Sequence, residues 1–395
     1  MKTNWQIKKL GEVCDIKPSK TEARKKLTPN ELVSFVPMED LGILSKSFNL
    51  NKERKLKDVS GSYTYFADND VLLAKITPCF ENGKLGIARN LKNGIGFGSS
   101  EFIVFRSRGE IYPEYIFYVL SSENFRENGR KLMSGAVGHK RVPKEYVENY
   151  EISLPPLAEQ KRIVKILDEV LGGIEKAREN AEKNLKNSHE LFESYLQNIF
   201  ANPRKDWQHK TLGDVCTLYQ GIAINAKTKH VLVEKSDLPL LRIKDLKNNT
   251  VEQYIDPNNY PVNALVSEED LIYTRTGSLG LVFRGKRGVL HNNSFKIVPS
   301  SELDKDYFFI WLQNPIFKSK IMNLALRAAQ PDITHAIFKI QEISIPSLEE
   351  QKAIVKKLDA LAGETKKLEA IFRRKIADLD ELKKSILKQA FAGEL

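Results

Sequence analysis

The chain repeats itself, and this repeat constrains the fold more than any other feature of the sequence. The eleven residues Glu151–Lys161 return at Glu342–Lys352, a shift of 191 positions, and the same shift carries Phe200-Ala201 onto Phe391-Ala392. The match therefore extends over about fifty residues without an insertion or a deletion. Loops tolerate changes of length, whereas helices packed in register do not. The pattern predicts two equal helices of fixed length in one chain.

The segments that precede the two helices also repeat, but with gaps. Trp5–Cys14 returns as Trp207–Cys216, a shift of 202, and Asp70–Lys75 returns as Asp270–Arg275, a shift of 200. Because the shift drifts, the loops between the matched residues must differ in length. The sequence thus indicates a variable domain followed by a constant helix, twice over.

We expect an α+β fold with two mixed α/β domains, separated by a long antiparallel two-helix coiled coil and related by a pseudo-two-fold repeat. A length of 395 residues suits two globular domains plus helices. The predicted boundaries are a first domain at 1–155, a first helix at 156–201, a second domain at 202–345 and a second helix at 346–395. Strand patterns bounded by turn residues, and one short helical pattern, predict the following elements. They are strands at Val71–Leu73, Phe102–Phe105, Leu271–Tyr273 and Phe295–Val298, and a helix at Tyr115–Leu120.

Apolar residues recur with three-four spacing along both helices, which is typical of a coiled-coil seam. At 1.5 Å per residue, a helix of about 45 residues is roughly 65 Å long. One narrow apolar stripe of that length needs a partner, and the twin helix is the nearest candidate. Arg178 and Ser188 interrupt the stripe of the first helix. The predicted seam comprises Val164, Leu167, Leu171, Ile174, Ala181, Leu185, Phe192, Tyr195 and Ile199, and then Leu358, Leu361, Leu368, Phe372, Leu379, Leu382 and Ile386.

The charge balance favours a polyanionic partner. The formal net charge is +11 and the isoelectric point is about 9.2. A basic surplus of this size is typical of nucleic-acid-binding proteins, although a merely soluble basic protein stays open as the alternative. The sequence contains no block of five like charges, so the cations are expected on folded surfaces.

Cysteine usage and hydropathy indicate a cytoplasmic protein. The three cysteines fit a reducing compartment, and Cys14 and Cys216 occupy equivalent repeat positions, so each is expected to fill the same core site in its own domain. No cysteine spacing indicates zinc. Residues 1–9 contain no apolar leader, and no apolar run reaches the roughly 18 residues of a membrane span.

Cations at strand ends are the candidate binding residues. Lys75 and Arg275 occupy equivalent positions where a strand runs into a loop, which is a suitable place for contact with a phosphate or a base edge. Segments before each long helix, and a third strand end, add further polar side chains. An exposed turn with an incidental cation stays open as the alternative for each of them. The predicted DNA-binding residues are Lys75, Thr77, His139, Lys140, Arg141, Arg242, Lys244, Arg275, Thr276, Ser278, Arg327 and Gln330.

Catalytic signals are weak. The sequence contains no P-loop, and Gly94–Gly98 precedes a strand pattern rather than a helix, so it does not indicate a dinucleotide site. The six histidines have no metal-ligand spacing, and no nucleophile lies in an evident pair with a base. We therefore predict no catalytic residues and no metal ligands.

The repeated motifs resemble type I restriction-modification specificity subunits. The resemblance is carried by residues 154–164 and their copy at 345–355, by the paired Leu-Gly-Glu-Val-Cys and Leu-Gly-Asp-Val-Cys starts, by Gln330-Pro331-Asp332-Ile333 and by the terminal Phe391–Leu395. It covers the whole chain. The first domain departs from the pattern, with Lys75–Pro78 where Arg-x-Gly is usual and Gly138–Lys140 where Gln-Pro-Asp is usual.

This resemblance implies two target recognition domains, each reading one half of a split sequence in double-stranded DNA. It also implies a helical spacer that docks the methyltransferase (modification) subunits and, through the complex, the restriction subunit. The chain would then be a non-catalytic DNA-specificity subunit that binds no cofactor, with S-adenosylmethionine, ATP and Mg²⁺ on its partner subunits. Two alternatives remain from the residues: a self-contained DNA methyltransferase or nuclease with fused recognition domains, and a purely structural coiled-coil adaptor.

Overall fold

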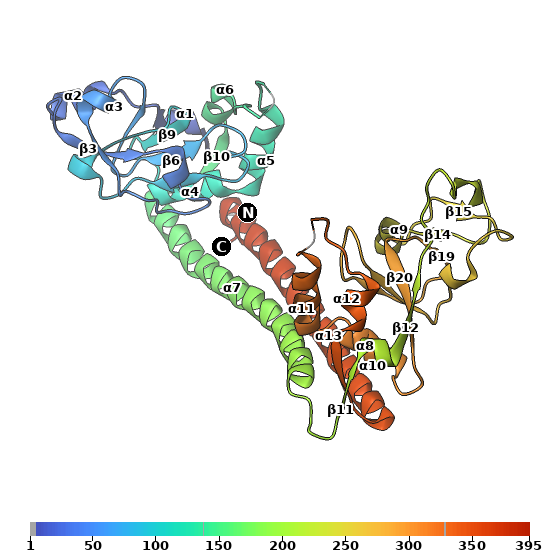
Figure 1. The fold of residues 1–395 in the computed structure, drawn as a ribbon. Coiled ribbons are helices and arrows are strands. Elements are labelled where there is room, and N and C mark those ends of the chain that lie inside the picture. Colours follow the sequence, from blue (N-terminus) through green and yellow to red (C-terminus); the bar gives the residue numbers. More distant parts are fainter. Residues whose placement is uncertain (1–4, 137, 328) are drawn as a thin grey trace. The chain divides into compact units, whose positions relative to one another are not determined.

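The computed structural model describes residues 5–136, 138–327 and 329–395. Met1–Asn4, on which part of the prediction about a leader rests, lie outside the described residues. The chain divides into two units, one formed by residues 1–182 and 374–395 and the other by residues 183–373. Each unit contains one globular domain together with parts of both long helices (Figure 1).

The domain of the first unit contains two four-stranded sheets and a two-stranded ribbon. One sheet has the order β2-β9-β6-β7, and its neighbours are all antiparallel. The other has the order β4-β3-β8-β5, in which β3 and β8 are parallel. The strands are β1 Gln6–Lys9, β2 Cys14–Ile16, β3 Leu32–Val36, β4 Glu53–Lys55, β5 Thr64–Ala67, β6 Val71–Ala74, β7 Leu85–Ile87, β8 Ile95–Gly98, β9 Phe102–Ser107 and β10 Glu151–Leu154.

Helices cover the first sheet and close the core. Helix α4 (Pro113–Ser121) begins with proline at a position where no amide donor is required, and its apolar residues are buried. Ser122 ends α4 and caps α5 (Glu123–Leu132) by accepting a hydrogen bond from the Phe125 amide. The remaining helices of this domain are α1 Leu10–Val13, α2 Thr21–Lys26, α3 Leu56–Val59 and α6 Lys144–Glu148.

The second unit repeats the plan of the first. Its main sheet has the order β12-β20-β17-β18, which matches β2-β9-β6-β7 strand for strand. The strands are β11 Gln208–Thr211, β12 Cys216–Gln220, β13 Leu232–Val233, β14 Leu240–Leu241, β15 Tyr254–Ile255, β16 Leu265–Val266, β17 Leu271–Thr274, β18 Val282–Phe283, β19 Gly288–Leu290, β20 Ser294–Pro299 and β21 Glu342–Ile345. The helices are α8 Leu212–Val215, α9 Ile243–Asn248, α10 Lys305–Trp311, α11 Pro315–Ala325 and α12 His335–Lys339. The four predicted strands and the predicted helix at Tyr115–Leu120 are therefore confirmed.

The two long helices, α7 (Leu157–Ala201) and α13 (Leu348–Ala392), each contain 45 residues. The glutamine of the repeated motif fixes the start of each. Gln160 is fully buried; its amide nitrogen donates to the carbonyls of Pro155 and Glu110, and its oxygen accepts from the Tyr112 amide. Gln351 makes the same three hydrogen bonds, to Pro346, Glu302 and Asp304. The motif therefore joins each helix start to the loop that precedes α4 or α10.

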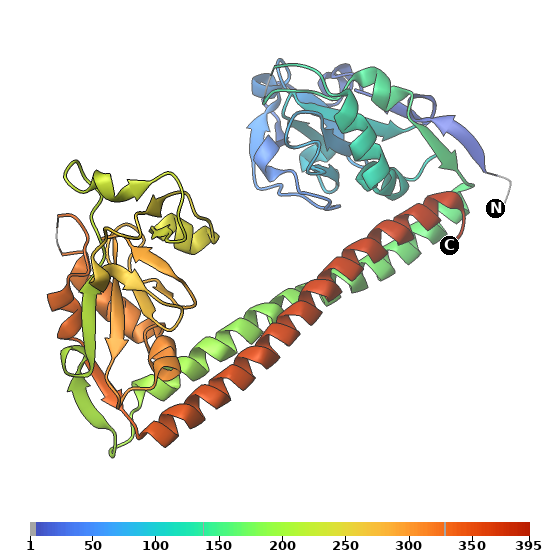
Figure 2. The same ribbon diagram turned by 90° about the vertical axis from the view of Figure 1, so that its right-hand side faces the viewer.

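The helices run antiparallel in each unit (Figures 1 and 2). In the first unit Arg178 Nε lies 3.3 Å from Asp380, and Lys383 lies 3.8 Å from Glu175. In the second unit His189 lies 3.6 Å from Glu369. Glu369 is the repeat equivalent of Arg178, and His189 is that of Asp380, so the basic and acidic members of the two contacts exchange places under the repeat.

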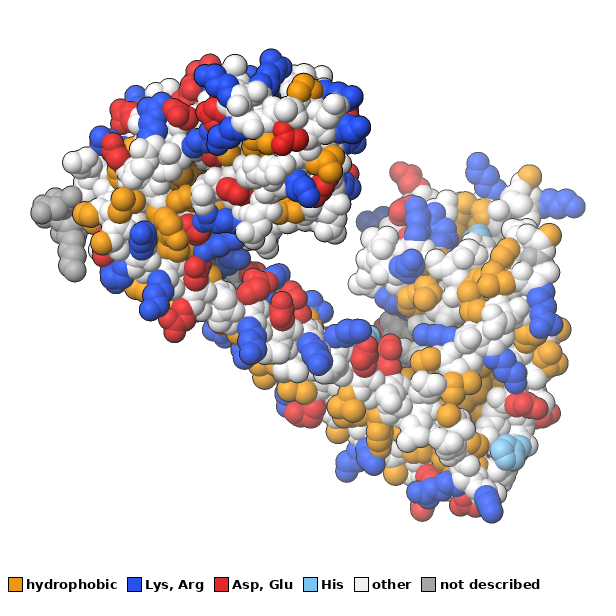
Figure 3. Space-filling model, turned by 90° about the vertical axis from the view of Figure 1, so that its left-hand side faces the viewer, with side chains coloured by type: hydrophobic (Ala, Val, Ile, Leu, Met, Phe, Trp, Pro, Cys, Tyr) orange, Lys and Arg blue, Asp and Glu red, His pale blue; other side chains and the backbone are white. Residues whose placement is uncertain are grey.

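The predicted seam is only partly right. Leu167, Ile174, Ala181 and Leu358 are buried, as expected. Leu368 and Leu382 are instead 41% and 45% exposed, so their assignment to the seam is wrong. The buried side chains near the end of α13 are Leu387 and Ala390. An apolar pattern that departs from a strict seven-residue repeat drifts around the helix surface, so residues at its edge turn away from the partner. Figure 3 shows cationic, acidic and apolar side chains mixed along the outer surface of the helices.

Cys14 and Cys216 are both buried and unpaired, as their equivalent positions predict. Burial raises the pKa of each thiol to about 12, which removes the reactive thiolate at neutral pH. Within the part of the chain that the structure describes, no helix is long and apolar enough to cross a membrane. The same residues contain no group of three side chains that could hold a metal ion.

Candidate nucleic-acid interface

The first domain brings together two segments that the sequence indicated separately. Lys75 and Thr77 leave the end of β6, and the segment 139–141 returns beside them. The Thr77 amide donates to the Lys140 carbonyl, and the Val142 amide donates to the Lys75 carbonyl, both at 2.9 Å. His139, Lys140 and Arg141 are exposed, whereas Lys75 and Thr77 are half-buried. This edge of the sheet thus carries a cluster of polar and cationic side chains.

Two of the cations at this edge have hydrogen-bond partners within the domain. Arg141 donates to both oxygens of Glu101, at 2.9 and 2.8 Å. Lys75 Nζ donates to the Ser100 carbonyl at 2.9 Å. The hydrogen bonds from Arg141, followed by the charge of Lys75, hold the pKa of Glu101 below its usual value. Thr77 donates to Glu81 at 2.7 Å, so its hydroxyl is also engaged within the domain.

The second domain has the same backbone arrangement with a different ion pair. The Ile333 amide donates to the Arg275 carbonyl at 2.9 Å, as Val142 does to Lys75. The Arg275 guanidinium forms a bidentate pair with Asp332 and contacts Gln220 Oε1 at 3.4 Å. Only 22% of the Arg275 side chain is exposed. Sequence reasoning selected Arg275 but missed Asp332 as its partner.

The acid of this cluster lies on a different segment in each domain. The amides of Lys75 and Arg275 donate to the carbonyls of Glu101 and Asn293, so these two residues are equivalent. The amides of Val142 and Ile333 donate to the carbonyls of Lys75 and Arg275, so the residues before them, Arg141 and Asp332, are also equivalent. In the first domain Glu101, on the β8–β9 loop, neutralises Arg141. In the second domain Asp332, in the segment before α12, neutralises Arg275.

The start of α9 adds a second cationic cluster to the second domain. Arg242 donates to Asp245 at 2.7 Å and to Glu252 at 2.9 Å, and Lys244 also pairs with Glu252. Asp245 is 2% exposed, so this carboxylate holds Arg242 from within the domain. A Cβ atom at Gly277 would lie 3.8 Å from Ile243, so the loop after β17 lies beside this helix start.

The remaining predicted residues lie on the same loops. The amide of Thr276 donates to the Asn293 carbonyl, and the Ser278 carbonyl accepts from the Thr274 hydroxyl. Arg327 and Gln330 are exposed and lie on either side of residue 328, which is outside the described part of the chain. Contact with DNA stays a prediction for all twelve residues.

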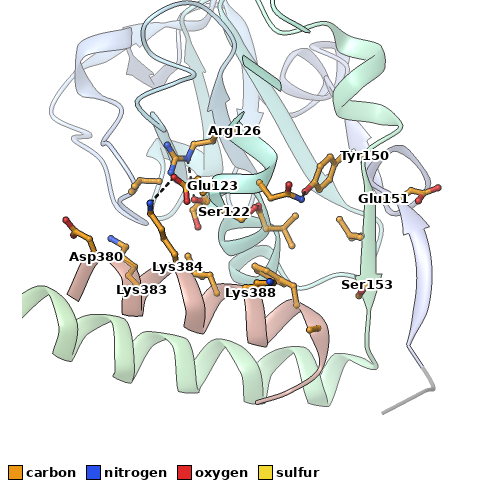
Figure 4. Close-up of a pocket in the computed structure, with 18 residues that line it drawn as sticks. Ser122, Glu123, Arg126, Tyr150, Glu151, Ser153, Asp380, Lys383, Lys384 and Lys388 are labelled. Carbon is orange, nitrogen blue, oxygen red and sulfur yellow. Dashed lines mark hydrogen bonds and ion pairs between the residues drawn. The ribbon is translucent and has the colours of Figure 1, made fainter. Parts of the chain in front are cut away.

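A hollow of about 870 Å³ lies in the first unit, where the corner between α4 and α5 meets β10 and the end of α13. Figure 4 shows Lys383 and Lys384 projecting from α13 toward this corner, where Lys384 pairs with Glu123 at 3.1 Å. A hollow of about 580 Å³ in the second unit is lined by the repeat-equivalent segments. In the two hollows these segments are Glu151–Ser153 with Phe391-Ala392, and Glu342 and Ser344 with Phe200-Ala201.

The two domains carry equivalent strand-edge clusters and matching main sheets, and each is followed by a long helix that begins at the repeated motif. The model of the type I restriction modification DNA specificity domain matches residues 2–183 and again 204–374. The chain belongs to this family, and each copy of the family domain coincides with one copy of the internal repeat.

The curated relatives include specificity subunits of type I restriction enzymes. The specificity subunits of the type I restriction enzymes EcoAI and EcoEI of Escherichia coli are 35% and 34% identical over 49% of this chain. The match spans only 32% of the length of each of these two relatives. The type I restriction enzyme MjaVIII specificity subunit of Methanocaldococcus jannaschii is 24% identical over 99% of this chain and 93% of its own length.

Two solved structures share the fold over the whole chain. One comes from work on the complex assembly and conformational transition of the type I R-M system. It has a TM-score of 0.78 at 22% identity, and the match covers 100% of this chain and 99% of that chain. The HsdS subunit from Thermoanaerobacter tengcongensis has a TM-score of 0.70 at 19% identity and covers 100% of this chain and 98% of its own. The architecture of two α/β domains and two long helices is therefore that of type I specificity subunits.

Proposed function

We propose that the chain is the non-catalytic DNA-specificity subunit of a type I restriction-modification complex. Its two globular domains act as target recognition domains, and each reads one half of a bipartite sequence in duplex DNA. The observation that carries this proposal is the same loop pair, with a cation at the end of a central strand, in both domains. Base edges are read by arginine, lysine and glutamine side chains presented on such loops.

The helices α7 and α13 are proposed to set the distance between the half-sites and to dock the methyltransferase (modification) subunits. Leucines at equivalent positions of the two helices are exposed, which supports a partner that uses the same contact twice. Leu157 and Leu348 are 42% and 43% exposed, and Leu191 and Leu382 are 61% and 45% exposed. The two equivalent hollows at the ends of the helices support the same interpretation.

In this proposal the chemistry belongs to other chains. S-adenosylmethionine is expected on the modification subunits, and ATP and Mg²⁺ on the restriction subunit that joins the complex. The complex would act in the cytoplasm, where genomic DNA is available for modification.

The proposal is tested by purifying the chain with and without its modification partner and incubating each sample with DNA and labelled S-adenosylmethionine. We expect methyl transfer only with the partner present, at an interrupted target that methylation mapping across a genome would reveal. Methyl transfer by the chain alone would favour the self-contained enzyme. A chain that shows no salt-sensitive affinity for DNA would favour a structural adaptor.

A further inference from the structure

A groove of about 720 Å³ crosses the first domain beside the strand-edge cluster. It lies between the segment that follows β2, the start of β5 and the end of β6. Among the described residues that line it, five are cationic and none is acidic. The five are Lys17, Lys20, Arg24, Lys75 and Lys144.

Backbone carbonyls rather than carboxylates hold most of these cations. Lys20 Nζ donates to the Gly61 carbonyl at 2.6 Å, and Arg24 donates to the Ser60 carbonyl at 3.3 Å. Lys75 is held in the same way by Ser100. Of the five, only Lys144 has an ion-pair partner within the described chain, Glu148 at 2.7 Å. The groove therefore concentrates positive charge, and Lys17, Lys20 and Arg24 have no ion-pair partner among the described residues.

Two acids on neighbouring segments, Glu22 and Glu101, have hydrogen-bond partners outside the groove. Glu22 accepts hydrogen bonds from Arg106 and from the Tyr65 hydroxyl, and Glu101 accepts from Arg141. Burial, followed by the charges of Lys17 and Arg24, lowers the pKa of Lys20. Like charges held close together repel one another, and a bound anion relieves that repulsion.

The second domain does not repeat this concentration of charge. Tyr219 stands at the position equivalent to Lys17, because Cys14 and Cys216 begin matching strands. Arg275, the equivalent of Lys75, is neutralised by Asp332. The groove is therefore a property of the first domain rather than of the repeated frame.

We infer that this groove binds the phosphodiester backbone of duplex DNA beside the first half-site, without reading its sequence. The inference rests on the proposed function of the domain as a DNA reader and adds the surface that holds the backbone. Phosphate contacts position a protein on DNA and release counterions, so they produce most of the salt dependence of binding. The first domain then contributes more to that salt dependence than the second.

The test compares two double variants of the full chain. Lys20→Gln with Arg24→Gln removes two charges from the groove, whereas Lys25→Gln with Lys26→Gln removes two exposed charges from α2 that do not line it. Affinity for a duplex would be measured by fluorescence anisotropy between 50 and 200 mM salt. Each lost phosphate contact reduces the slope of log affinity against log salt by about 0.9, so the groove variant should show a slope smaller by about 1.8. Over that range its affinity should fall roughly ten-fold less than that of the unaltered chain.

The control variant should keep the original slope, and Arg24→Lys, which retains the charge, should keep it as well. Thermal unfolding of all variants identifies any loss of affinity that comes from misfolding, and in that case Arg24→Lys is compared with Arg24→Gln.

Equal slopes for the groove and control variants would overturn the inference while leaving the proposed function intact. Displacement of DNA by inorganic phosphate at constant ionic strength would also overturn it, because the groove would then be a site for the free ion. An unaltered chain that binds no duplex would remove the proposed function, and this inference with it.

Discussion

Gln160 and Gln351 show how one side chain can fix the junction between a domain and a helix. Each amide satisfies one backbone N–H and two carbonyls that would otherwise lack partners in a buried position. A buried polar group without a partner costs about 1–3 kcal/mol. The glutamine of the repeated motif therefore has a structural explanation that does not involve DNA or a partner subunit.

We expect Gln160→Leu to destabilise the first unit by at least about 2 kcal/mol, because it leaves the Tyr112 amide without its acceptor. Hydrogen exchange at that amide should accelerate, and urea denaturation should occur at a lower midpoint. Gln197→Leu, on the exposed side of the same helix, is the matched control and should change neither quantity. Unchanged exchange at Tyr112 would show that the motif has another role.

Arg275 is the residue on which the recognition proposal can be tested most directly. Arg275→Ala should weaken specific DNA binding by about 1–3 kcal/mol and relax specificity at one position of the second half-site if the guanidinium contacts a base edge. Asp332→Asn breaks the same ion pair but keeps the cation. A purely structural role of the pair predicts equal effects of both variants on binding, whereas base recognition predicts relaxed specificity for Arg275→Ala alone. Methylation mapping of the assembled complex separates the two outcomes.

At the scale of elements, the long helices are paired by an apolar seam and by charges at its margin. Arg178 interrupts the seam of α7, and the structure explains how it is tolerated: it lies near Glu175 and Glu182 on its own helix and near Asp380 on α13. The Arg178 and Asp380 side chains are 35% and 50% exposed, so the pair is expected to contribute only about 0.2–1 kcal/mol.

Reversal of this pair tests the antiparallel register. Arg178→Glu alone should lower the thermal midpoint, because it places a further acid beside Glu175, Glu182 and Asp380, and addition of Asp380→Arg should restore part of the loss. The recovery should be largest at low salt and should shrink in 1 M salt, where the Debye length is about 3 Å. A double variant no more stable than Arg178→Glu alone would show that the two side chains do not face each other in solution.

At the scale of the whole molecule, the ungapped helices are proposed to measure the target. Insertion of one heptad after Leu185 and another after Ile376 keeps the apolar stripe in phase. The gap between the half-sites should lengthen, while the bases read by each domain stay the same, because neither recognition loop is altered. Methylation mapping gives both quantities at once. Altered bases with an unchanged gap would show that the helices are not the spacer.

The sequence predicted the duplicated plan well because a repeat reports length and order directly. The helices α7 and α13, their antiparallel pairing and the matching central strands follow from it. The candidate site was harder to predict, since its ion pairs join distant residues: Arg275 and Asp332 lie 57 positions apart. The basic groove was missed for the same reason, because Lys17, Lys75 and Lys144 meet only in the fold. The domain boundaries at 155, 201 and 345 stay predictions.

The exchange of acid and base between the two helix contacts also limits which changes the repeated halves of the gene can tolerate. A long repeat within one gene is a substrate for gene conversion, in which one half of the gene is copied over the other. If the α7 copy replaced α13, Arg178 would face a second His189, and if the α13 copy replaced α7, Glu369 would face a second Asp380. Either conversion removes the Arg178–Asp380 ion pair, and replacement of α7 by the α13 copy also places two acids opposite each other at both contacts. Selection for a stable helix pair thus favours keeping the two halves of the gene distinct, even where their motifs remain nearly the same.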